Sequence, residues 1–578
     1  MKNKITAALA GSALLVAPYA AAVDYSFDTT LSYGLQWRVA DRDDSLVGKA
    51  NLNPATALMT PEQFIAAPGA FSVNGDAGNL NYDDGDLISN AAKITSEFSM
   101  RGDTFGFFAR GFYFYDFENV DHPGLSPAAR RRVGERGDIL DAFVYGDWNI
   151  GESQRPFSLR AGKQVVNWGE STFIQGGINV INPIDVSVLR VPGAELRDAL
   201  LPVMALWSSI GVSENVSMEL FWQAQWKPIK IDPPGTYFST ANFVGAGGNE
   251  VVLGFGQFTR DQAFANGAVV ARAPSVTPDD GGEYGAALRW FSPRFDTEFG
   301  FFALNYHSRL PVLSGIAVTG ASPSTGRYYT EYPEDIKLYG ISFNTVMAGW
   351  AMQGEYSYRP NQPLQFDDVE LLFGALSPLN AVLPHSHFLS QLGTFAPGAN
   401  VQGYERHKVG QAQVTATYLF GQNNPFRASN MVFLTELAVT HVYDLPDRSV
   451  LRYEGPGTST GGGADRTTGD LRNPLTQRGG FADATSWGYR MAARVDYNSV
   501  FGAWNMSPRL AFAHDVSGTS PGPGGNFIEG RKSISAGLNF LRLEKFAVDV
   551  SYTNYFGGGA FNLISDRDFA AIDFKYSF

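Results

Sequence analysis

Polar and apolar positions alternate along much of the chain. In residues 25–39 the odd positions are mostly apolar, including Tyr25, Phe27, Trp37 and Val39, whereas the even positions are polar or glycine. Because successive side chains of a β-strand point to opposite faces, this segment predicts a strand with one apolar and one polar face.

Eighteen segments share this period of two, and most have ten or more residues. That is longer than the usual globular strand and matches the length that crosses a bilayer at a tilt. The segments are 25–39, 91–101, 104–117, 139–149, 156–165, 203–212, 216–227, 283–291, 296–307, 336–346, 349–360, 407–420, 430–443, 485–498, 506–516, 530–540, 545–556 and 568–578.

Charged side chains keep to one face of most segments. A Lys or Arg on the lipid side of a membrane strand costs about 2–4 kcal/mol at the midplane, so a membrane strand should hold its charges on one side. Of 14 segments with two or more charges, 11 obey this rule. In 156–165, Arg160 and Lys163 differ, and we expect Lys163 near the rim. The other two exceptions are 530–540 and 568–578, where a charge of the opposite parity lies within the first two residues. The orientation of 430–443 stays open, because both faces around Glu436 are largely apolar.

The links between the segments alternate between long and short. Outer-membrane barrels have short periplasmic turns and longer extracellular loops, whereas long structureless loops count against a compact soluble domain. We therefore predict an all-β fold, a transmembrane antiparallel outer-membrane β-barrel of about 18 strands, with 16 as the alternative. The long links are 40–90, 118–138, 166–202, 228–282, 308–335, 361–406, 444–484, 517–529 and 557–567.

The first residues carry an export signal. Lys2 and Lys4 precede an apolar stretch from Ile5 to Val16, and the small residues Ala20–Ala22 follow. This order predicts a secretory signal peptide over 1–22, with a buried N-terminal helix as the alternative. Residues 23–578 then form a single barrel in the outer membrane of a Gram-negative bacterium.

The composition limits the fold classes and the binding partners that fit this chain. Aromatic residues make up 13% and charged residues 17% of the 578 positions, which argues against disorder. A net charge of −13 argues against a nucleic-acid partner, and the lack of cysteine excludes disulfides and thiolate sites. The mean hydropathy of −0.13 is the average of half-apolar strands and polar loops.

The polar strand faces are expected to line the lumen. One interpretation is that their charges solvate and cross-link the inner wall, and the other is that a basic stripe near Arg490 and Arg494 guides an anionic solute. Aromatic lumenal positions such as Phe112 and Phe221 favour apolar solutes. The candidate pore-lining residues are Arg38, Arg110, Glu219, Lys227, Glu355, Arg359, Arg490, Arg494 and Arg509.

The link 166–202 is more apolar than the other long links. Because an exposed loop of this kind is costly, we expect it to enter the barrel mouth or pack on the inner wall as a constriction or plug. A loop packed at the rim without a gating role is the alternative. A short helix is expected over 193–200. The candidate constriction residues are Trp168, Glu170, Asp185, Glu195 and Arg197.

Several strings carry a resemblance. Residues 162–171 (GKQVVNWGES), 181–185 (INPID), 192–195 (PGAE), 514–521 (HDVSGTSP) and 529–532 (EGRK) are similar to segments of a proteobacterial outer-membrane family of unknown function, catalogued as DUF1302. The resemblance implies an outer-membrane protein. Such proteins are often encoded beside a periplasmic partner family and sometimes beside inner-membrane transporters of the resistance-nodulation-division type.

Motifs for catalysis are weak. Residues 457–461 match G-x-S-x-G, but a nucleophile elbow needs a strand before it and a helix after it, and this match lies in a glycine-rich loop. His385 and His387 have no third ligand at a recognisable spacing. We therefore predict no enzyme. A barrel-type hydrolase that uses His441 or His514 is the third function considered.

Acidic clusters lie in the long links, where solvated charge is the expected role. No resident cofactor is predicted, and weak binding of a divalent cation at the outer surface is the alternative, because oxygen ligands suit Ca²⁺. The clusters are Asp41, Asp43 and Asp44; Asp83, Asp84 and Asp86; and Asp279 and Asp280.

The last strand ends on Phe578. A C-terminal strand that ends on an aromatic residue resembles the signal read by the outer-membrane assembly machinery, and membrane lipid is the other expected partner. The leading function is a passive channel for small organic solutes, either hydrophobic or anionic. The alternative is a non-channel envelope protein that docks a periplasmic partner in an export or trafficking pathway.

Overall fold

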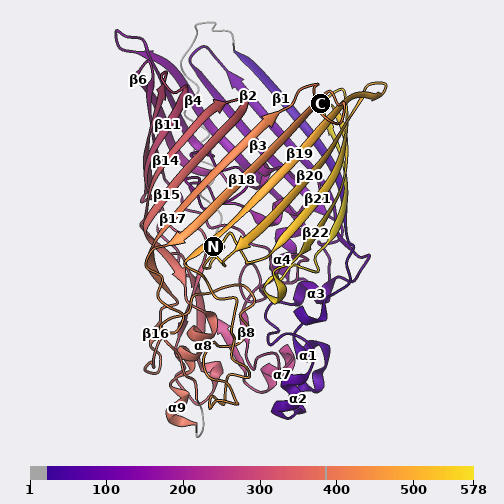
Figure 1. Ribbon diagram of the computed structural model, residues 1–578, viewed down its shortest axis with the longest axis vertical. Helices are drawn as coiled ribbons and strands as arrows, with labels where there is room; N and C mark the ends of the chain where they lie inside the picture. The colour runs from indigo at the N-terminus through magenta and orange to yellow at the C-terminus, as the bar shows by residue number, and fades with distance from the viewer. Residues whose placement is uncertain (1–22, 384–386) are drawn as a thin grey trace, which may run out of the picture.

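The computed structural model contains a closed barrel of 18 antiparallel strands with long links at one end (Figure 1). The first strand pairs with both the second and the last, which closes the cylinder. Every predicted segment overlaps one barrel strand, so the fold prediction and the count of 18 are confirmed. The strands are β1 Asp24–Arg38, β2 Leu87–Arg101, β3 Phe105–Asp116, β4 Glu135–Ile150, β5 Arg155–Gln164, β6 Val203–Ser213, β7 Val216–Gln223, β10 Glu283–Ser292, β11 Thr297–Tyr306, β14 Ile336–Met347, β15 Trp350–Gln365, β17 Tyr404–Leu419, β18 Asn430–Val442, β19 Thr485–Phe501, β20 Trp504–Ser517, β21 Lys532–Arg542, β22 Phe546–Phe556 and β23 Phe569–Ser577.

The structure describes residues 23–383 and 387–578. The predicted signal peptide, 1–22, and His385 of the predicted histidine pair lie outside the described residues. No helix in the described ranges is long and apolar enough to cross a membrane.

The faces of the strands follow the alternation in the sequence. In β1, Leu31 is 42% exposed on the outside, whereas Ser32 and Gln36 are buried inside. The open orientation of β18 is settled by Glu436, which is 0% exposed beside the 42% exposed Leu437. Glu436 therefore points inward.

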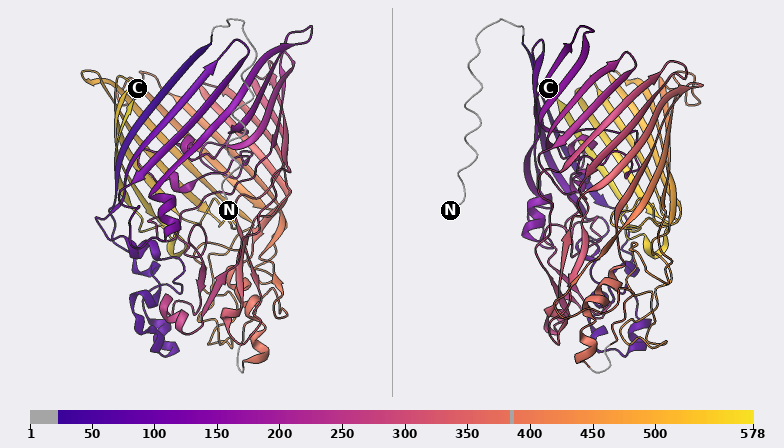
Figure 2. Two further views of the ribbon diagram at one scale, coloured as in Figure 1. Left: turned by 180° about the vertical axis from the view of Figure 1, so that it is seen from behind. Right: turned by 90° about the vertical axis from the view of Figure 1, so that its left-hand side faces the viewer.

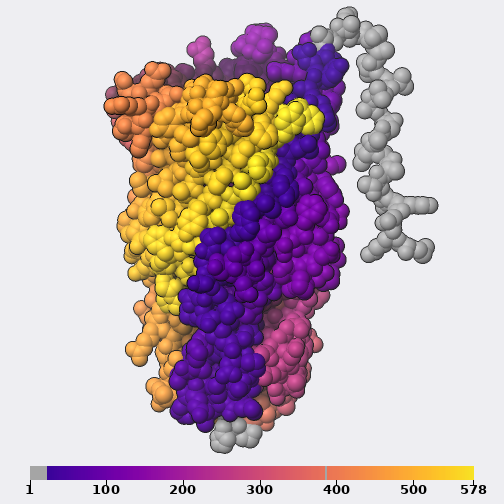
Figure 3. All heavy atoms as spheres, turned by 90° about the vertical axis from the view of Figure 1, so that its right-hand side faces the viewer, coloured from indigo at the N-terminus to yellow at the C-terminus, as the bar shows by residue number. Residues whose placement is uncertain are grey.

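The long links and the short turns lie at opposite ends of the barrel (Figure 2). Strand β1 begins at the short-turn end, where Asp24 pairs with Arg101, and the C-terminus lies at the same end. The backbones of Phe578 and Thr29 exchange two hydrogen bonds of 3.0 Å, which extends the seam to the last residue. Figure 3 shows this seam as the yellow C-terminal strands against the indigo first strand.

The long links other than the one between β5 and β6 fold together into a cap beyond the barrel (Figure 1). The cap contains a five-stranded sheet in the order β16-β12-β13-β9-β8, in which only β13 and β9 are parallel. Its strands are β8 Glu250–Val252, β9 Val269–Arg272, β12 Val312–Ile316, β13 Arg327–Glu331 and β16 Asn400–Val401. An apolar core that includes Val270, Tyr328 and Phe373 joins this sheet to the helices beside it.

Helices in the links are short. The α-helices are α1 Lys49–Leu52, α2 Pro61–Ala66, α3 Ala77–Asn81, α4 Pro127–Val133, α5 Val186–Leu189, α6 Leu196–Ala199, α7 Arg260–Ala265, α8 Asp368–Leu376 and α9 Leu379–Val382. The 3-10 helices are η1 Asp44–Leu46, η2 Pro54–Leu58, η3 Pro323–Thr325 and η4 Gly559–Phe561. The helix predicted over 193–200 is present as α6, in shorter form.

One predicted strand is too long. Strand β7 ends at Gln223 rather than at residue 227. Gln223 pairs with Glu283, the first residue of β10, so β10 offers no strand partner beyond it. Lys227 therefore lies in the next link, where its Nζ donates to the carbonyl of Pro202 at 3.1 Å. Its predicted place on a barrel strand is wrong.

Candidate functional site

The link between β5 and β6 runs inside the barrel. Its side chains Trp168, Ile178 and Ile181 are almost fully buried in one cluster with Phe302 of β11 and Leu338 of β14. This apolar segment therefore has an apolar patch of inner wall to cover. We name residues 165–202 the inner loop.

Glycines in the wall make room for the inner loop. A Cβ on Gly34 of β1 would lie 2.5 Å from the Cβ of Pro192, and one on Gly340 of β14 would lie 2.7 Å from Ile178 Cδ1. Real Cβ atoms do not approach other atoms so closely. The wall is therefore shaped for contact with the loop on both sides of the barrel interior.

Glu436 anchors the turn of the inner loop. Its carboxylate accepts the backbone N–H groups of Thr172 at 2.8 Å, Phe173 at 2.7 Å and Ile174 at 2.8 Å, and the hydroxyl of Thr415 at 3.2 Å. Hydrogen bonds to an ionised acceptor are stronger than neutral ones. These donors replace the water that a buried carboxylate loses.

Glu355 anchors the segments on either side of that turn. It accepts the backbone N–H of Glu170 and that of Ile178, the latter at 2.7 Å, and the amide of Gln413 at 3.0 Å. Arg359 on the same strand donates to the carbonyl of Gly177 at 2.5 Å. Glu355 and Arg359 therefore hold the backbone of the loop.

A second group of charges holds the far end of the inner loop. Lys93 of β2 pairs with Asp198 at 2.7 Å, and both side chains are buried. Arg110 donates to the carbonyl of Arg197 at 2.9 Å, and Arg197 pairs with Glu97 at 2.7 Å. The loop is thus fixed to the wall at both ends.

The other candidate constriction residues also contact neighbouring chain segments. Trp168 Nε1 donates to Glu219 at 2.7 Å. The remaining contacts are Glu170 with Asn344 at 3.4 Å, Asp185 with Arg136 at 2.5 Å, and Glu195 with Lys575 at 3.3 Å. The structure thus brings these predicted residues to the wall, and a gating role stays a prediction.

Arginines elsewhere on the wall have carboxylate partners. Arg38, at the end of β1, is buried under the cap and donates to the carbonyl of Tyr82. Arg494 is the most open of the group, with its side chain 62% exposed. The pairs are Arg38–Asp566 at 3.1 Å, Arg110–Asp141 at 2.8 Å, Arg490–Asp515 at 2.7 Å, Arg494–Asp496 at 2.7 Å and Arg509–Asp549 at 2.6 Å.

The cap encloses a cavity of about 840 Å³. Side chains from several separate links line it, and many are apolar, including Phe71, Phe243, Leu372 and Phe561. The carboxyl groups of the wall come from links as well, since Asp368 and Glu454 are among the lining residues. Sequence reasoning missed this cavity, because its walls are assembled from segments far apart in the chain.

The predicted acidic clusters mostly serve local turns. Asp43 accepts the N–H of Ser45 at 2.8 Å, and Asp86 accepts that of Asp83 at 2.7 Å. Within the described ranges, a different set, Asp367, Asp368 and Glu454, forms the only acidic group with a spacing that suits a metal ion. Sequence reasoning did not single out this set, and the only local signal for it is the aspartate pair shortly after β15.

The weak catalytic motifs have ordinary surroundings. Residues 457–461 lie in an irregular link between β18 and β19, with neither a strand directly before them nor a helix directly after. His441 contacts the hydroxyl of Thr485 at 2.7 Å, and His514 contacts that of Tyr489 at 3.4 Å.

A comparison with known protein families shows to which family the chain belongs. The sequence profile of the family described as "Protein of unknown function (DUF1302)" matches residues 3–578. The chain belongs to this family. No curated protein sequence matches this DUF1302 protein significantly.

Solved structures that resemble the DUF1302 chain have low sequence identity to it. Pseudomonas aeruginosa OccK2 (OpdF) in complex with glucuronate is 8% identical, with 96% of this chain and 97% of that chain covered and a TM-score of 0.37. Acinetobacter baumannii OccAB1 is 8% identical over 96% of each chain, with a TM-score of 0.41. Pseudomonas aeruginosa OpdK with vanillate is 10% identical over 96% and 98%, with a TM-score of 0.37.

Proposed function

We propose that this DUF1302 protein is a non-enzymatic outer-membrane channel for small organic solutes with an apolar body, and that the inner loop is its constriction. The observation that carries the proposal is the apolar cavity of about 840 Å³ in the cap, at the long-loop end of a barrel lined by an anchored loop. Ligand sites are typically apolar concavities of this size with a few polar groups.

The surface and the closure of the barrel support a location in the outer membrane. Its outer face is apolar, and a closed barrel leaves no unpaired strand edge to lipid. Long links face the outside of the cell in such barrels, so the cap and its cavity would meet a solute first. Phe578 would be available to the assembly machinery at the periplasmic end.

An apolar solute fits better than an anionic one. The arginines of the predicted basic stripe, Arg490 and Arg494, are each paired with a carboxylate. Paired arginines attract an anion less than free ones, because the neighbouring negative charge cancels most of the field. Arg490 thereby joins β19 to β20, whereas Arg494 and Asp496 lie on the same strand.

Conductance in planar bilayers tests the channel. Gln164 and Val203 are paired across β5 and β6, so residues 172–200 can be removed and the ends rejoined by a short link. We expect a small conductance for the wild type and a several-fold larger one for the deletion. The proposal fails if neither protein conducts ions nor passes solute.

Uptake of the apolar fluorophore N-phenyl-1-naphthylamine by cells with an intact lipopolysaccharide layer tests the solute class. Leu372→Arg places a charge on the cavity wall and should lower the uptake several-fold. Leu80→Arg, at an exposed cap position outside the cavity lining, is the matched control and should leave it unchanged. Equal uptake by both variants would contradict a role of the cavity.

A further inference from the structure

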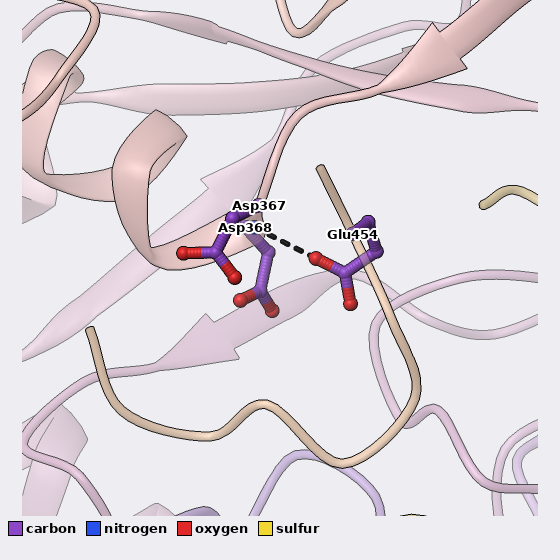
Figure 4. A group of neighbouring side chains, drawn as sticks. All are labelled: Asp367, Asp368 and Glu454. Atoms are coloured by element: carbon purple, nitrogen blue, oxygen red, sulfur yellow. Dashed lines mark hydrogen bonds between the residues drawn. The ribbon is translucent and has the colours of Figure 1, made fainter. Parts of the chain in front are cut away.

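Three carboxyl groups converge at the wall of the cap cavity. Asp367 and Asp368 follow the end of β15, and Glu454 comes from the link between β18 and β19. One oxygen from each residue lies within 4.8 Å of the others (Figure 4). We name these residues the acidic trio.

Local hydrogen bonds fix the direction of the trio. Asp367 caps helix α8, because its Oδ2 accepts the N–H of Glu370 at 3.3 Å. Glu454 Oε2 accepts the backbone N–H of Asp368 at 2.8 Å. Each bond orients a carboxylate and leaves its other oxygen for a further partner.

Two of the remaining oxygens are buried and have no partner. The side chain of Asp367 is 0% exposed, and Asp367 Oδ1 and Asp368 Oδ1 are both buried without a hydrogen-bond donor. A buried polar oxygen without a partner is unfavourable, and it is far more unfavourable if it is charged. The trio is therefore incomplete as a purely protein structure.

No positive side chain completes it. Arg452 is the basic residue whose charge acts on Asp367, but its guanidinium is already paired with Glu370 at 2.5 Å. Across the ranges that the structure describes, no ion pair joins a Lys, Arg or His to any member of the trio. Burial raises the pKa of Asp368 to about 6 and raises the pKa values of Asp367 and Glu454 well above the ordinary range.

We propose that the acidic trio binds one hard divalent cation of the Ca²⁺ type at the wall of the cap cavity. All three ligands are oxygens, and Ca²⁺ takes six to eight oxygens at about 2.3–2.6 Å, so one ion can touch all three groups. Asp368 and Glu454 also line the cavity, from which water can fill the remaining positions. The site does not depend on the channel proposal.

The ion would have a structural consequence for the cap. It would join the start of α8 to the link between β18 and β19, which are separated by some 86 residues from Asp368 to Glu454. A bound cation stabilises the state that binds it. Ca²⁺ should therefore brace one wall of the cavity.

Titration calorimetry of CaCl₂ into the full chain, in detergent free of lipopolysaccharide, tests the site at pH 7.5. We expect one Ca²⁺ per chain. Asp368→Asn and Glu454→Gln should each weaken binding at least tenfold, while Asp279→Asn, in an exposed acidic pair of the cap, should leave it unchanged. No heat from the wild type, or equal binding by Asp368→Asn, overturns the proposal.

Protease resistance of the cap gives a second readout that a structural role alone would not produce. In EDTA, Asp368→Asn should digest more slowly than the wild type, because it relieves repulsion between buried carboxylates. With Ca²⁺ the order should reverse, since only the wild type gains the ion. If the variant is the weaker protein under both conditions, Asp368 acts through its hydrogen bonds and the cation site is wrong.

Discussion

The inner wall and the cap both bury carboxylates, and they treat them differently. On the wall, Glu355 and Glu436 receive five backbone N–H groups from the inner loop. In the cap, Asp367 and Asp368 each keep a buried oxygen without a donor. The carboxylates of the wall receive hydrogen bonds from the chain itself. The buried oxygens of the cap need a proton or a cation as a partner.

This difference separates a structural device from a binding site. Both sets join segments that are distant in sequence, because Glu436 holds Thr172 and Glu454 holds Asp368. A buried charge is tolerated only when hydrogen bonds or an opposite charge replace its lost hydration. The wall meets this condition without a ligand, and the cap does not.

The double change Glu355→Gln and Glu436→Gln should have the largest effect. Each glutamine keeps the size but loses the charge, and its NH₂ group cannot accept the loop N–H groups. At about 1.5–3 kcal/mol for each bond to a charged group, several such losses should release the loop. Single-channel conductance should rise toward that of the loop deletion.

The matched control for this change is Glu298→Gln, which alters a more exposed carboxylate paired with Arg289. It should conduct like the wild type. If the double variant also keeps the wild-type conductance and its loop stays resistant to protease, the wall carboxylates do not hold the loop.

The cap should respond to pH in the opposite sense with and without Ca²⁺. In EDTA the folded cap binds a proton on Asp368 with a pKa of about 6, above the unfolded value of about 3.9. Stability is therefore gained as the pH falls through 6 and lost as it rises. With Ca²⁺ present, acid displaces the ion, so stability should fall as the pH falls.

Limited proteolysis of the cap between pH 5 and 7.5 measures both trends. Arg452 and Glu370 face the same region but form a pair of their own, so they should contribute little across this range. Asp368→Asn should make both curves less steep, and the remaining slope should come from Asp367 and Glu454, whose pKa values are also raised. Parallel trends in EDTA and in Ca²⁺ would show that the trio does not exchange protons for a cation.

The barrel could be predicted from the sequence because the features that indicate it are local in the chain. Alternation, charge parity and link length act over about ten residues, and they placed all 18 strands. The orientation of Glu436 could not be predicted in this way, because both faces of its strand are largely apolar. Only the contact with the inner loop explains why a charged residue lies there. The alternation places Lys227 on a strand because it continues past Gln223, where β7 loses its partner β10.

The sites were less readable because they depend on contacts between distant segments. The apolar character of the inner loop predicted that it packs inside the barrel or at its rim. No local pattern in the sequence specifies the apolar cluster that Trp168 forms with Phe302 on the wall. The acidic trio needed Glu454 brought beside Asp367, which requires the folded cap. Neither a spacing nor a motif in the sequence encodes that approach.

The smallest expected effect comes from a neutral anchor of the same loop. Gln353 Nε2 donates to the carbonyl of Glu170 at 2.9 Å, beside the bonds made by Glu355. A neutral hydrogen bond contributes about 0.5–1.5 kcal/mol, so Gln353→Ala alone should raise the frequency of brief openings without changing the main conductance. Single-channel recordings at fixed voltage measure this frequency. If Gln353→Ala opens the channel as widely as the double glutamate change, the distinction between charged and neutral anchors is lost, and the loop is held by packing around Trp168 instead.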